Sequence, residues 1–152
     1  MRKYLYLLVS VLVIVLDQTS KWWMLHHLTL YHPQAIWPML NLTLAFNTGS
    51  AFSFLSHAGA WHHWFFVIFS VGMSIFLLIW IYRLPVHARV QLINISLILG
   101  GALGNLIDRL RYGYVIDFID LRFFPSFNYA DLFTTLGVCL WIYRLEFMHL
   151  QE

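Results

Sequence analysis

Charged residues are scarce in this sequence. Asp, Glu, Lys and Arg make up 11% of its 152 residues, whereas hydrophobic residues make up 61%. Soluble domains carry roughly 25% charged residues, so this chain lacks the polar surface that a water-soluble globule needs. The same composition excludes a disordered protein and a coiled coil. The chain is therefore expected to be an integral membrane protein.

Several kinds of site are also missing. The single cysteine, Cys139, cannot form an internal disulfide, and the net charge of +2 is too small and scattered for a nucleic-acid binder. The eight histidines include two adjacent pairs, no His-Glu-x-x-His pattern occurs, and no metal site or cofactor is expected. Neither a Gly-x-Ser-x-Gly elbow nor a phosphate-binding loop is present.

Four stretches are long and apolar enough to cross a bilayer, which takes about 20 residues. We expect one integral membrane domain over residues 1–152, with spans at about 4–24, 61–82, 90–107 and 132–148. The first stretch resembles a secretory signal peptide, but no small-x-small cleavage site follows it, which favours an uncleaved span. Four spans place both termini on one side, and the two arginines of the short loop 83–89 favour the cytoplasm.

The acidic residues cluster at one face of this predicted topology. Asp17 ends the first span, Asp108 and Asp117 follow the third, and Asp131 opens the fourth. Ionisable groups at membrane depth cost a few kcal/mol on insertion scales, so they usually pair and often take part in chemistry. Polar partners recur at helical spacing in the pairs Asp17 with Lys21 and Asn105 with Arg109. Gly100 and Gly104, one turn deeper, allow a neighbouring backbone to come close.

Each acid also has a structural interpretation. Asp17 and Lys21 could snorkel to the interface, Asp131 could cap the fourth helix, and Asp117 could pair with Arg111 or Arg122 as a loop acid. Separate structural roles would not explain the polar side chains around these acids. These side chains are Asn47, Asn105, Arg109 and Asn128.

Two carboxylates brought together beside apolar walls share one proton and titrate as a unit. The ionised member can take a proton from water while the protonated one polarises a carbonyl, as in aspartic proteases. Either Asp117 or Asp131 could be the initial base. A proton-linked transporter or channel component and a structural membrane subunit remain as alternatives.

Five ordered blocks span most of the chain. They are Asp17-Gln-Thr-Ser-Lys21, Asn47-Thr-Gly-Ser-Ala-Phe52, Gly100-Gly-Ala-Leu-Gly-Asn105-Leu-Ile-Asp108-Arg109, Gly113-Tyr-Val-Ile-Asp117-Phe118 and Phe127-Asn128-Tyr-Ala130-Asp131. In this order the sequence resembles the lipoprotein signal peptidase (signal peptidase II) family of aspartyl peptidases. The resemblance implies that Asp117 and Asp131 are the catalytic pair. It also implies supporting positions at Asp17, Lys21, Asn47, Asn105, Arg109 and Asn128.

The resemblance implies an all-α fold of four transmembrane helices with a small extracytoplasmic β-cradle and a short amphipathic helix. Leu28 to Phe54 and the stretch through Ala60 are the expected counterparts of these two features. It further implies a monomer, surrounded by membrane lipid, in the bacterial inner membrane with its active site toward the periplasm. The expected substrate is a diacylglyceryl-modified prolipoprotein, cut just before the lipidated cysteine. The connection from Asp120 to Phe127 is short for the family, and Arg111 and Asp120 receive no role.

Overall fold

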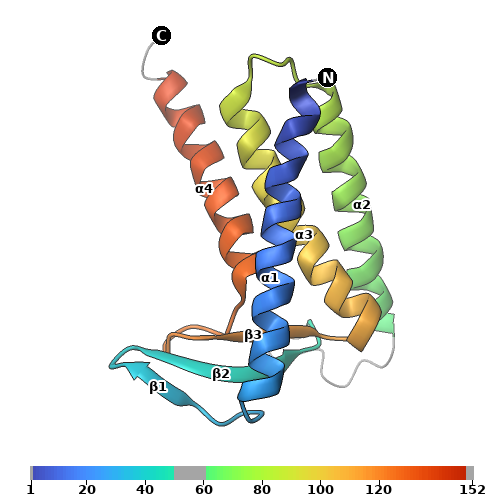
Figure 1. Ribbon diagram of the computed structural model, residues 1–152. Coiled ribbons are helices and arrows are strands. Elements are labelled where there is room, and N and C mark those ends of the chain that lie inside the picture. Colours follow the sequence, from blue (N-terminus) through green and yellow to red (C-terminus); the bar gives the residue numbers. More distant parts are fainter. Residues whose placement is uncertain (1, 50–60, 150–152) are drawn as a thin grey trace.

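The computed structural model describes residues 2–49 and 61–149, in which four long helices stand side by side above a small sheet (Figure 1). The first residues of the chain, the end of the last helix and the connection between the second and third helices lie at the end opposite the sheet. The elements in chain order are η1 (Arg2–Tyr6), α1 (Leu7–His27), β1 (Gln34–Trp37), β2 (Leu40–Asn47), α2 (Trp61–Arg83), α3 (Arg89–Tyr112), β3 (Val115–Asp120) and α4 (Tyr129–His149).

Among the described residues, three helices are long and apolar enough to cross a membrane. They cover Lys3–His27, Trp61–Arg83 and Arg89–Tyr112, where the first three spans were predicted. The predicted span at 132–148 lies within α4, whose 21 residues correspond to about 30 Å of helix. The helix surfaces expose large apolar side chains, such as Ile68 and Phe76 of α2. Such surfaces suit contact with hydrocarbon rather than with water.

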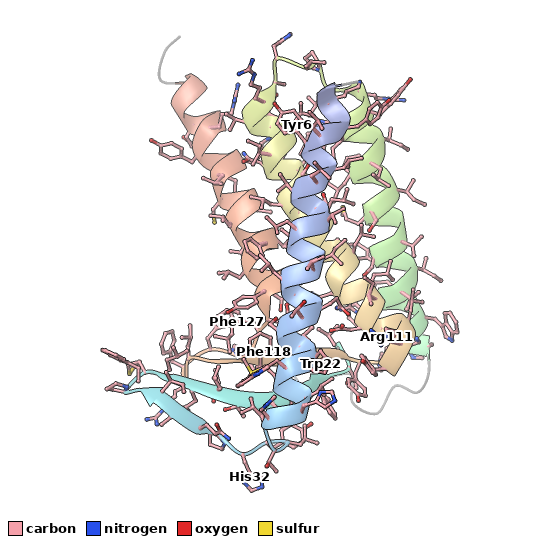
Figure 2. The ribbon with its side chains drawn as sticks, viewed as in Figure 1. Tyr6, Trp22, His32, Arg111, Phe118 and Phe127 are labelled. Atoms are coloured by element: carbon pink, nitrogen blue, oxygen red, sulfur yellow. The ribbon has the colours of Figure 1, made fainter. Side chains whose placement is uncertain are left out.

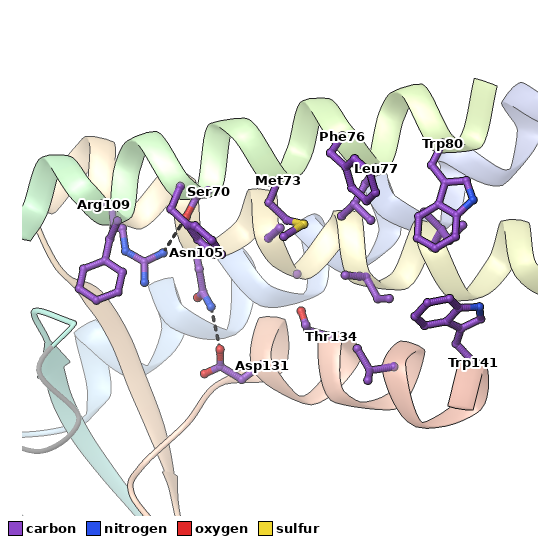
Figure 3. A pocket seen from close by; sticks show the side chains of 17 residues that line it. Ser70, Met73, Phe76, Leu77, Trp80, Asn105, Arg109, Asp131, Thr134 and Trp141 are labelled. Carbon is purple, nitrogen blue, oxygen red and sulfur yellow. Dashed lines mark hydrogen bonds between the residues drawn. The ribbon is translucent and has the colours of Figure 1, made fainter. Parts of the chain in front are cut away.

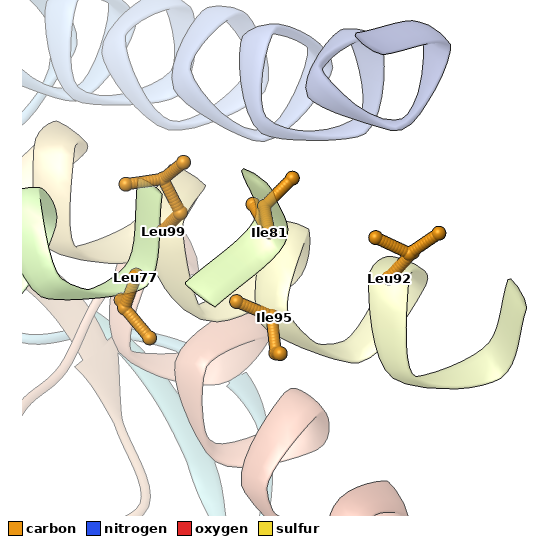
Figure 4. Close-up of a cluster of buried hydrophobic side chains, with 5 residues drawn as sticks. All are labelled: Leu77, Ile81, Leu92, Ile95 and Leu99. Carbon is orange, nitrogen blue, oxygen red and sulfur yellow. The ribbon is translucent and has the colours of Figure 1, made fainter. Parts of the chain in front are cut away.

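The α3 helix occupies the centre of the bundle and packs against the other three long helices. Its residues Leu92, Ile95 and Leu99 form a buried cluster with Leu77 and Ile81 of α2 (Figure 4). This cluster lies in the half of the bundle away from the sheet, whereas Asp108 and Arg109, near the other end of α3, lie in the half close to the sheet.

Glycines on α3 allow its neighbours to come close, as predicted for Gly100 and Gly104. A Cβ atom at Gly100 would lie 2.7 Å from the Val13 Cβ of α1, which no real side chain tolerates. A Cβ at Gly101 would overlap the carbonyl oxygen of Ala130 at the start of α4. Small residues therefore bring α1 and α4 onto α3, as small-xxx-small patterns do in membranes.

The sheet has the antiparallel order β1-β2-β3 and lies across one end of the bundle. Gly113, with a φ of 83°, ends α3 in the left-handed conformation and lets the chain turn directly into β3. Leu28, Leu44 and Ile116 form a second buried cluster that attaches the sheet to the end of α1. Phe118 and Phe127 lie where the sheet meets the start of α4, and Trp22 lies at the same end of α1 (Figure 2).

This sheet corresponds to the β-cradle that the resemblance implied for residues 28–54, completed by β3. The predicted amphipathic helix through Ala60 falls in residues 50–60, which lie outside the described part of the chain. Ser50 and Phe52 of the second sequence block lie outside it as well.

Candidate active site

All eight predicted site residues gather where the helices meet the sheet. Asp117 comes from the middle of β3, Asp131 from the first turn of α4, and Asn47 from the end of β2. The other five positions are Asp17 and Lys21 on α1, Asn105 and Arg109 on α3, and Asn128 immediately before α4. Antiparallel pairing of β2 with β3 brings Asn47 beside Asp117, 70 residues further along the chain.

Asp117 is 2% exposed and receives a hydrogen bond on each carboxyl oxygen. Asn128 Nδ2 donates to Oδ1 at 2.7 Å, and Asn47 Nδ2 donates to Oδ2 at 3.0 Å. The amide of Asn47 is fixed in this orientation because its oxygen accepts the backbone N–H of Gly49. Asp117 is therefore held from two sides, and neither Arg111 nor Arg122 supplies these bonds.

Asp131 both caps α4 and belongs to the site. The Asn128 side chain accepts the N–H of Asp131, and Asp131 Oδ2 in turn accepts the N–H of Asn128. This reciprocal arrangement is a capping box, which favours an anion at a helix N-terminus. The other carboxyl oxygen of Asp131 accepts a bond of 2.8 Å from Asn105 Nδ2 (Figure 3). The capping role is thus confirmed, but it does not exclude a place in the site.

Asn128 connects the two carboxyl groups. It is completely buried, and it contacts Asp117 through its amide nitrogen and Asp131 through its backbone N–H. Burial and the nearby negative charge of Asp131 raise the pKa of Asp117 to about 7, against the effect of the Asn47 and Asn128 donors. Asp117 therefore keeps its proton to a higher pH than an exposed aspartate does.

An apolar groove of about 750 Å³ leads to Asp131 (Figure 3). Side chains of α2, α3 and α4 line it, with Trp80 and Trp141 packed edge to face at one end. Asn105, Arg109 and Asp131 form the opposite, polar end. The groove can therefore hold an apolar chain whose end lies beside the carboxylate of Asp131.

Arg109 spans the groove's polar end. Its guanidinium donates to the Ser70 hydroxyl of α2 at 3.3 Å and lies 5.4 Å from the centre of the Phe66 ring. Its positive charge lies within electrostatic reach of Asp131 and Asp117. Asp117 lines a smaller cavity of about 210 Å³, together with residues that include Asn47 and Ser126.

Asp17 and Lys21 form the predicted ion pair, with 2.8 Å between Oδ2 and Nζ. Their side chains are 0% and 2% exposed, so the interpretation in which they snorkel to the interface is wrong. Lys21 Nζ also contacts Asp108 Oδ2 at 2.7 Å, and Gln18 Nε2 donates to Asp108 Oδ1 at 2.8 Å. Sequence reasoning assigned no site role to Asp108 or Gln18. The sequence did hold one indication that Asp108 faces α1. Asp108 lies four residues after Gly104, on the same face of α3, and Gly104 packs against Asp17 of α1.

Asp120 and Arg111 lie apart from this network. Asp120 accepts bonds from the Thr43 hydroxyl and from the N–H of Arg122, and these donors lower the pKa of Asp120. The Arg111 guanidinium lies 5.3 Å from the centre of the neighbouring Tyr112 ring. Asp120 is thus a carboxylate on the same strand as Asp117 that can serve as a control.

Comparison with known proteins assigns this arrangement to one group. The family model described as Signal peptidase (SPase) II matches residues 9–147. A lipoprotein signal peptidase of Coxiella burnetii is 49% identical over 140 residues, which are 90% of this chain and 86% of that protein. One of Acinetobacter baumannii is 47% identical over 147 residues, 94% of this chain and 84% of that protein.

Among solved structures, a bacterial membrane enzyme determined by the in meso method superposes with a TM-score of 0.81. It is 34% identical in sequence, and the match covers 92% of this chain and 91% of that one. The helical bundle and sheet are therefore shared with a bacterial membrane enzyme over nearly the whole length of both chains.

Proposed function

This chain belongs to the signal peptidase II family, and we propose that Asp117 and Asp131 are the aspartates with which it removes signal peptides from prolipoproteins. The enzyme is an aspartic peptidase. The observation that carries the residue assignment is Asn128, which is bonded to both carboxyl groups. The apolar groove that ends at Asp131 supports the same assignment.

The chemistry follows from the different surroundings of the two acids. Asp117, with its pKa raised to about 7, holds the shared proton and polarises the scissile carbonyl. Asp131 then takes a proton from the water that attacks this carbonyl. The C–N bond breaks when the peptide nitrogen receives a proton from the pair, which restores the starting state without a covalent intermediate.

Supporting residues hold this pair and the substrate. Asn105 fixes Asp131, while Asn47 and Asn128 fix Asp117. Arg109 faces the groove at its polar end, where its guanidinium can bind a peptide carbonyl. The substrate backbone must be extended at this point, because a helix hides its carbonyl groups in its own hydrogen bonds.

The groove suits a substrate that carries lipid. We propose that a diacylglyceryl-modified prolipoprotein enters it sideways from the bilayer and is cut before its lipidated cysteine. Acyl chains and the apolar part of the signal peptide gain about 0.8 kcal/mol per buried methylene. The aromatic and aliphatic lining between Phe66 and Trp141 provides such a surface.

The proposed topology places one four-span domain, 1–152, in the inner membrane as a monomer, with α4 as the fourth span. The start of η1, the end of α4 and the loop with Arg83 and Arg89 lie at one end of the bundle, which the positive-inside rule assigns to the cytoplasm. The sheet and the aspartate pair then face the periplasm.

The test compares Asp117→Asn and Asp131→Asn with the unmodified enzyme in detergent. Each variant is expected to lose signal-peptide cleavage of a lipidated prolipoprotein by at least about a thousandfold, because removing one member of a catalytic unit disables it. Asp120→Asn, which changes an acid outside the pair, is the matched control and keeps its turnover. The unlipidated prolipoprotein is expected to remain uncut.

Substantial turnover by either variant of the pair, at a melting temperature close to that of the parent, would exclude the pair. If the parent enzyme cuts neither the lipidated nor the unlipidated prolipoprotein, the peptidase function itself is rejected.

A further inference from the structure

A buried ion triad lies directly behind the proposed catalytic pair. Lys21 Nζ contacts Asp17 Oδ2 at 2.8 Å and Asp108 Oδ2 at 2.7 Å, and it donates to Asn105 Oδ1 at 3.0 Å. An ammonium group has three hydrogen-bond donors, so each one has an acceptor here. None of the three charged side chains is more than 2% exposed. The triad is therefore almost completely shielded from solvent.

Both acids of the triad also hold the backbone next to a catalytic aspartate. Asp17 Oδ1 accepts the N–H of Ala130 at 2.9 Å, and Ala130 immediately precedes Asp131. Asp108 Oδ2 accepts the N–H of Ile116 at 3.1 Å, and Ile116 immediately precedes Asp117. Each arm of the triad is thus attached to the chain one residue before a member of the pair.

A second route joins the same lysine to the carboxyl groups through side chains. Asn105 accepts from Lys21 and donates to Asp131 at 2.8 Å. The oxygen of Asn105 also accepts from Asn128 at 3.1 Å, and Asn128 donates to Asp117. A shift of the ammonium group would therefore be transmitted to both aspartates by backbone and side chains together.

Gln18 completes the network on the side of α1. Its Nε2 atom donates to Asp108 Oδ1 at 2.8 Å and to the Gly104 carbonyl at 3.1 Å, and it lies 3.2 Å from Asp17 Oδ2. Gly104 leaves the space for this arrangement, since a Cβ there would lie 2.7 Å from Asp17 Oδ2.

The burial of this ion triad is weak evidence that it serves to stabilise the fold. Burying two carboxylates and one ammonium costs several kcal/mol per ion in desolvation, and well-packed apolar residues often stabilise a fold equally well. A rigid and fully bonded polar network does, however, restrict the geometry of what is attached to it.

We propose that Asp108 and Gln18 are positioning residues which, with Asp17 and Lys21, fix the separation of the two catalytic carboxyl groups. The inference rests on the proposed roles of Asp117 and Asp131. Asp108 and Gln18 do not line the substrate groove, so they act on the chemical step and not on binding.

The first test is Asp108→Asn, which keeps the shape of the side chain but removes its charge and one acceptor oxygen. Its kcat is expected to fall about tenfold to a hundredfold, since small misplacements of reacting groups cost this much, while KM stays within about twofold. Asp108→Glu restores the charge but moves the carboxylate by one methylene, so it is not expected to rescue kcat.

Gln18→Met is the milder variant, because it keeps the three charges and removes only the bridging amide. Its kcat is expected to fall severalfold at unchanged KM. If Asp108→Asn does not fold, the kcat of Gln18→Met alone tests the positioning role. Asp120→Asn removes an acid that accepts a backbone N–H at the far end of β3 and is expected to leave kcat unchanged.

The proposal is overturned if folded Asp108→Asn and Gln18→Met retain the parent kcat, or if KM alone changes. Full recovery of kcat in Asp108→Glu would also overturn it, because charge balance would then suffice. Turnover by Asp117→Asn or Asp131→Asn would instead reject the proposed catalytic pair, so the two failures can be told apart.

Discussion

At the scale of single residues, Asn47 controls how tightly Asp117 holds its proton. The Asn47 amide donates to Asp117 and so favours the ionised carboxylate, which lowers the pKa of Asp117 from where burial and Asp131 would place it. In Asn47→Ala this donor is lost, and the pKa of Asp117 rises. Since we propose that the protonated form polarises the substrate carbonyl, the alkaline decline of kcat/KM, expected near pH 7 in the parent, is expected to move to higher pH in this variant.

The measurement is a pH–rate profile of the parent and of Asn47→Ala on the same lipidated substrate. Thr43→Val is the matched control, because it removes a hydroxyl that donates to Asp120 at 2.8 Å, on the same strand but outside the pair. Its profile is expected to coincide with that of the parent. A decline that stays in place or moves to lower pH in Asn47→Ala would contradict the role given to Asp117.

The residues of the site were largely predictable from sequence because they combine polarity with an apolar context. Asp17 and Lys21 stand four apart on one helix, so their pairing follows from local geometry. Asp108 was missed as their partner because the contact crosses from α3 to α1, which no local spacing reveals. The bonds from Asp17 to Ala130 and from Asp108 to Ile116 involve backbone groups that carry no sequence signal.

At the scale of elements, Gly101 determines how α4 begins. A side chain at this position would overlap the Ala130 carbonyl and the Thr134 hydroxyl, both in the first turns of α4. Gly101→Ala is therefore expected to lower stability by about 1–3 kcal/mol through overpacking. It is also expected to reduce kcat, because Asp131 moves with that turn.

Gly72 supplies the control for this substitution, since a Cβ there meets nothing within 4 Å. Gly72→Ala should keep full activity and gain up to about 1 kcal/mol from helix propensity. Thermal unfolding and kcat are measured on both variants side by side. Equal behaviour of the two would show that the contact between α3 and α4 at Gly101 does not position the site.

Helices were predicted more accurately than the sheet. Long apolar runs identify α1, α2 and α3 directly, whereas the strands are short and β3 begins only three residues after the end of α3. Pairing of β2 with β3 contains a register shift between Leu42 and Ala45, and a shift by one residue reverses which face a side chain takes. That Asn47 would lie beside Asp117 therefore could not be derived from spacing alone.

At the scale of the whole molecule, the distribution of polar groups separates a peptidase from a proton-conducting protein. A relay needs ionisable groups spread through the depth of the membrane. In the described residues, the Asp17, Lys21 and Asp108 triad and the Asp117 and Asp131 pair all lie toward the sheet. In the other half of the bundle, α2 and α3 bury a cluster of leucine and isoleucine, and the polar residues buried beside it, Ser74, Asn94 and Ser96, are not ionisable.

The orientation in the membrane can be tested by cysteine labelling, since Cys139 is the chain's single cysteine. In a Cys139→Ser background, Trp37→Cys places a thiol on β1, where the side chain is 72% exposed. His87→Cys places one in the exposed loop between α2 and α3, at the opposite end of the bundle. Neither position contacts the aspartate pair, so activity reports that both variants are folded.

A membrane-impermeant maleimide added to intact spheroplasts is expected to label Trp37→Cys and to leave His87→Cys unlabelled until the membrane is opened. A protease site appended to the C-terminus should likewise be cut only in opened membranes, because α4 as a fourth span returns the chain to the side of the Arg83–Arg89 loop. The reverse labelling pattern would invert the proposed orientation. Cleavage of the C-terminal site in intact spheroplasts, with His87→Cys still protected, would show that α4 does not cross the bilayer.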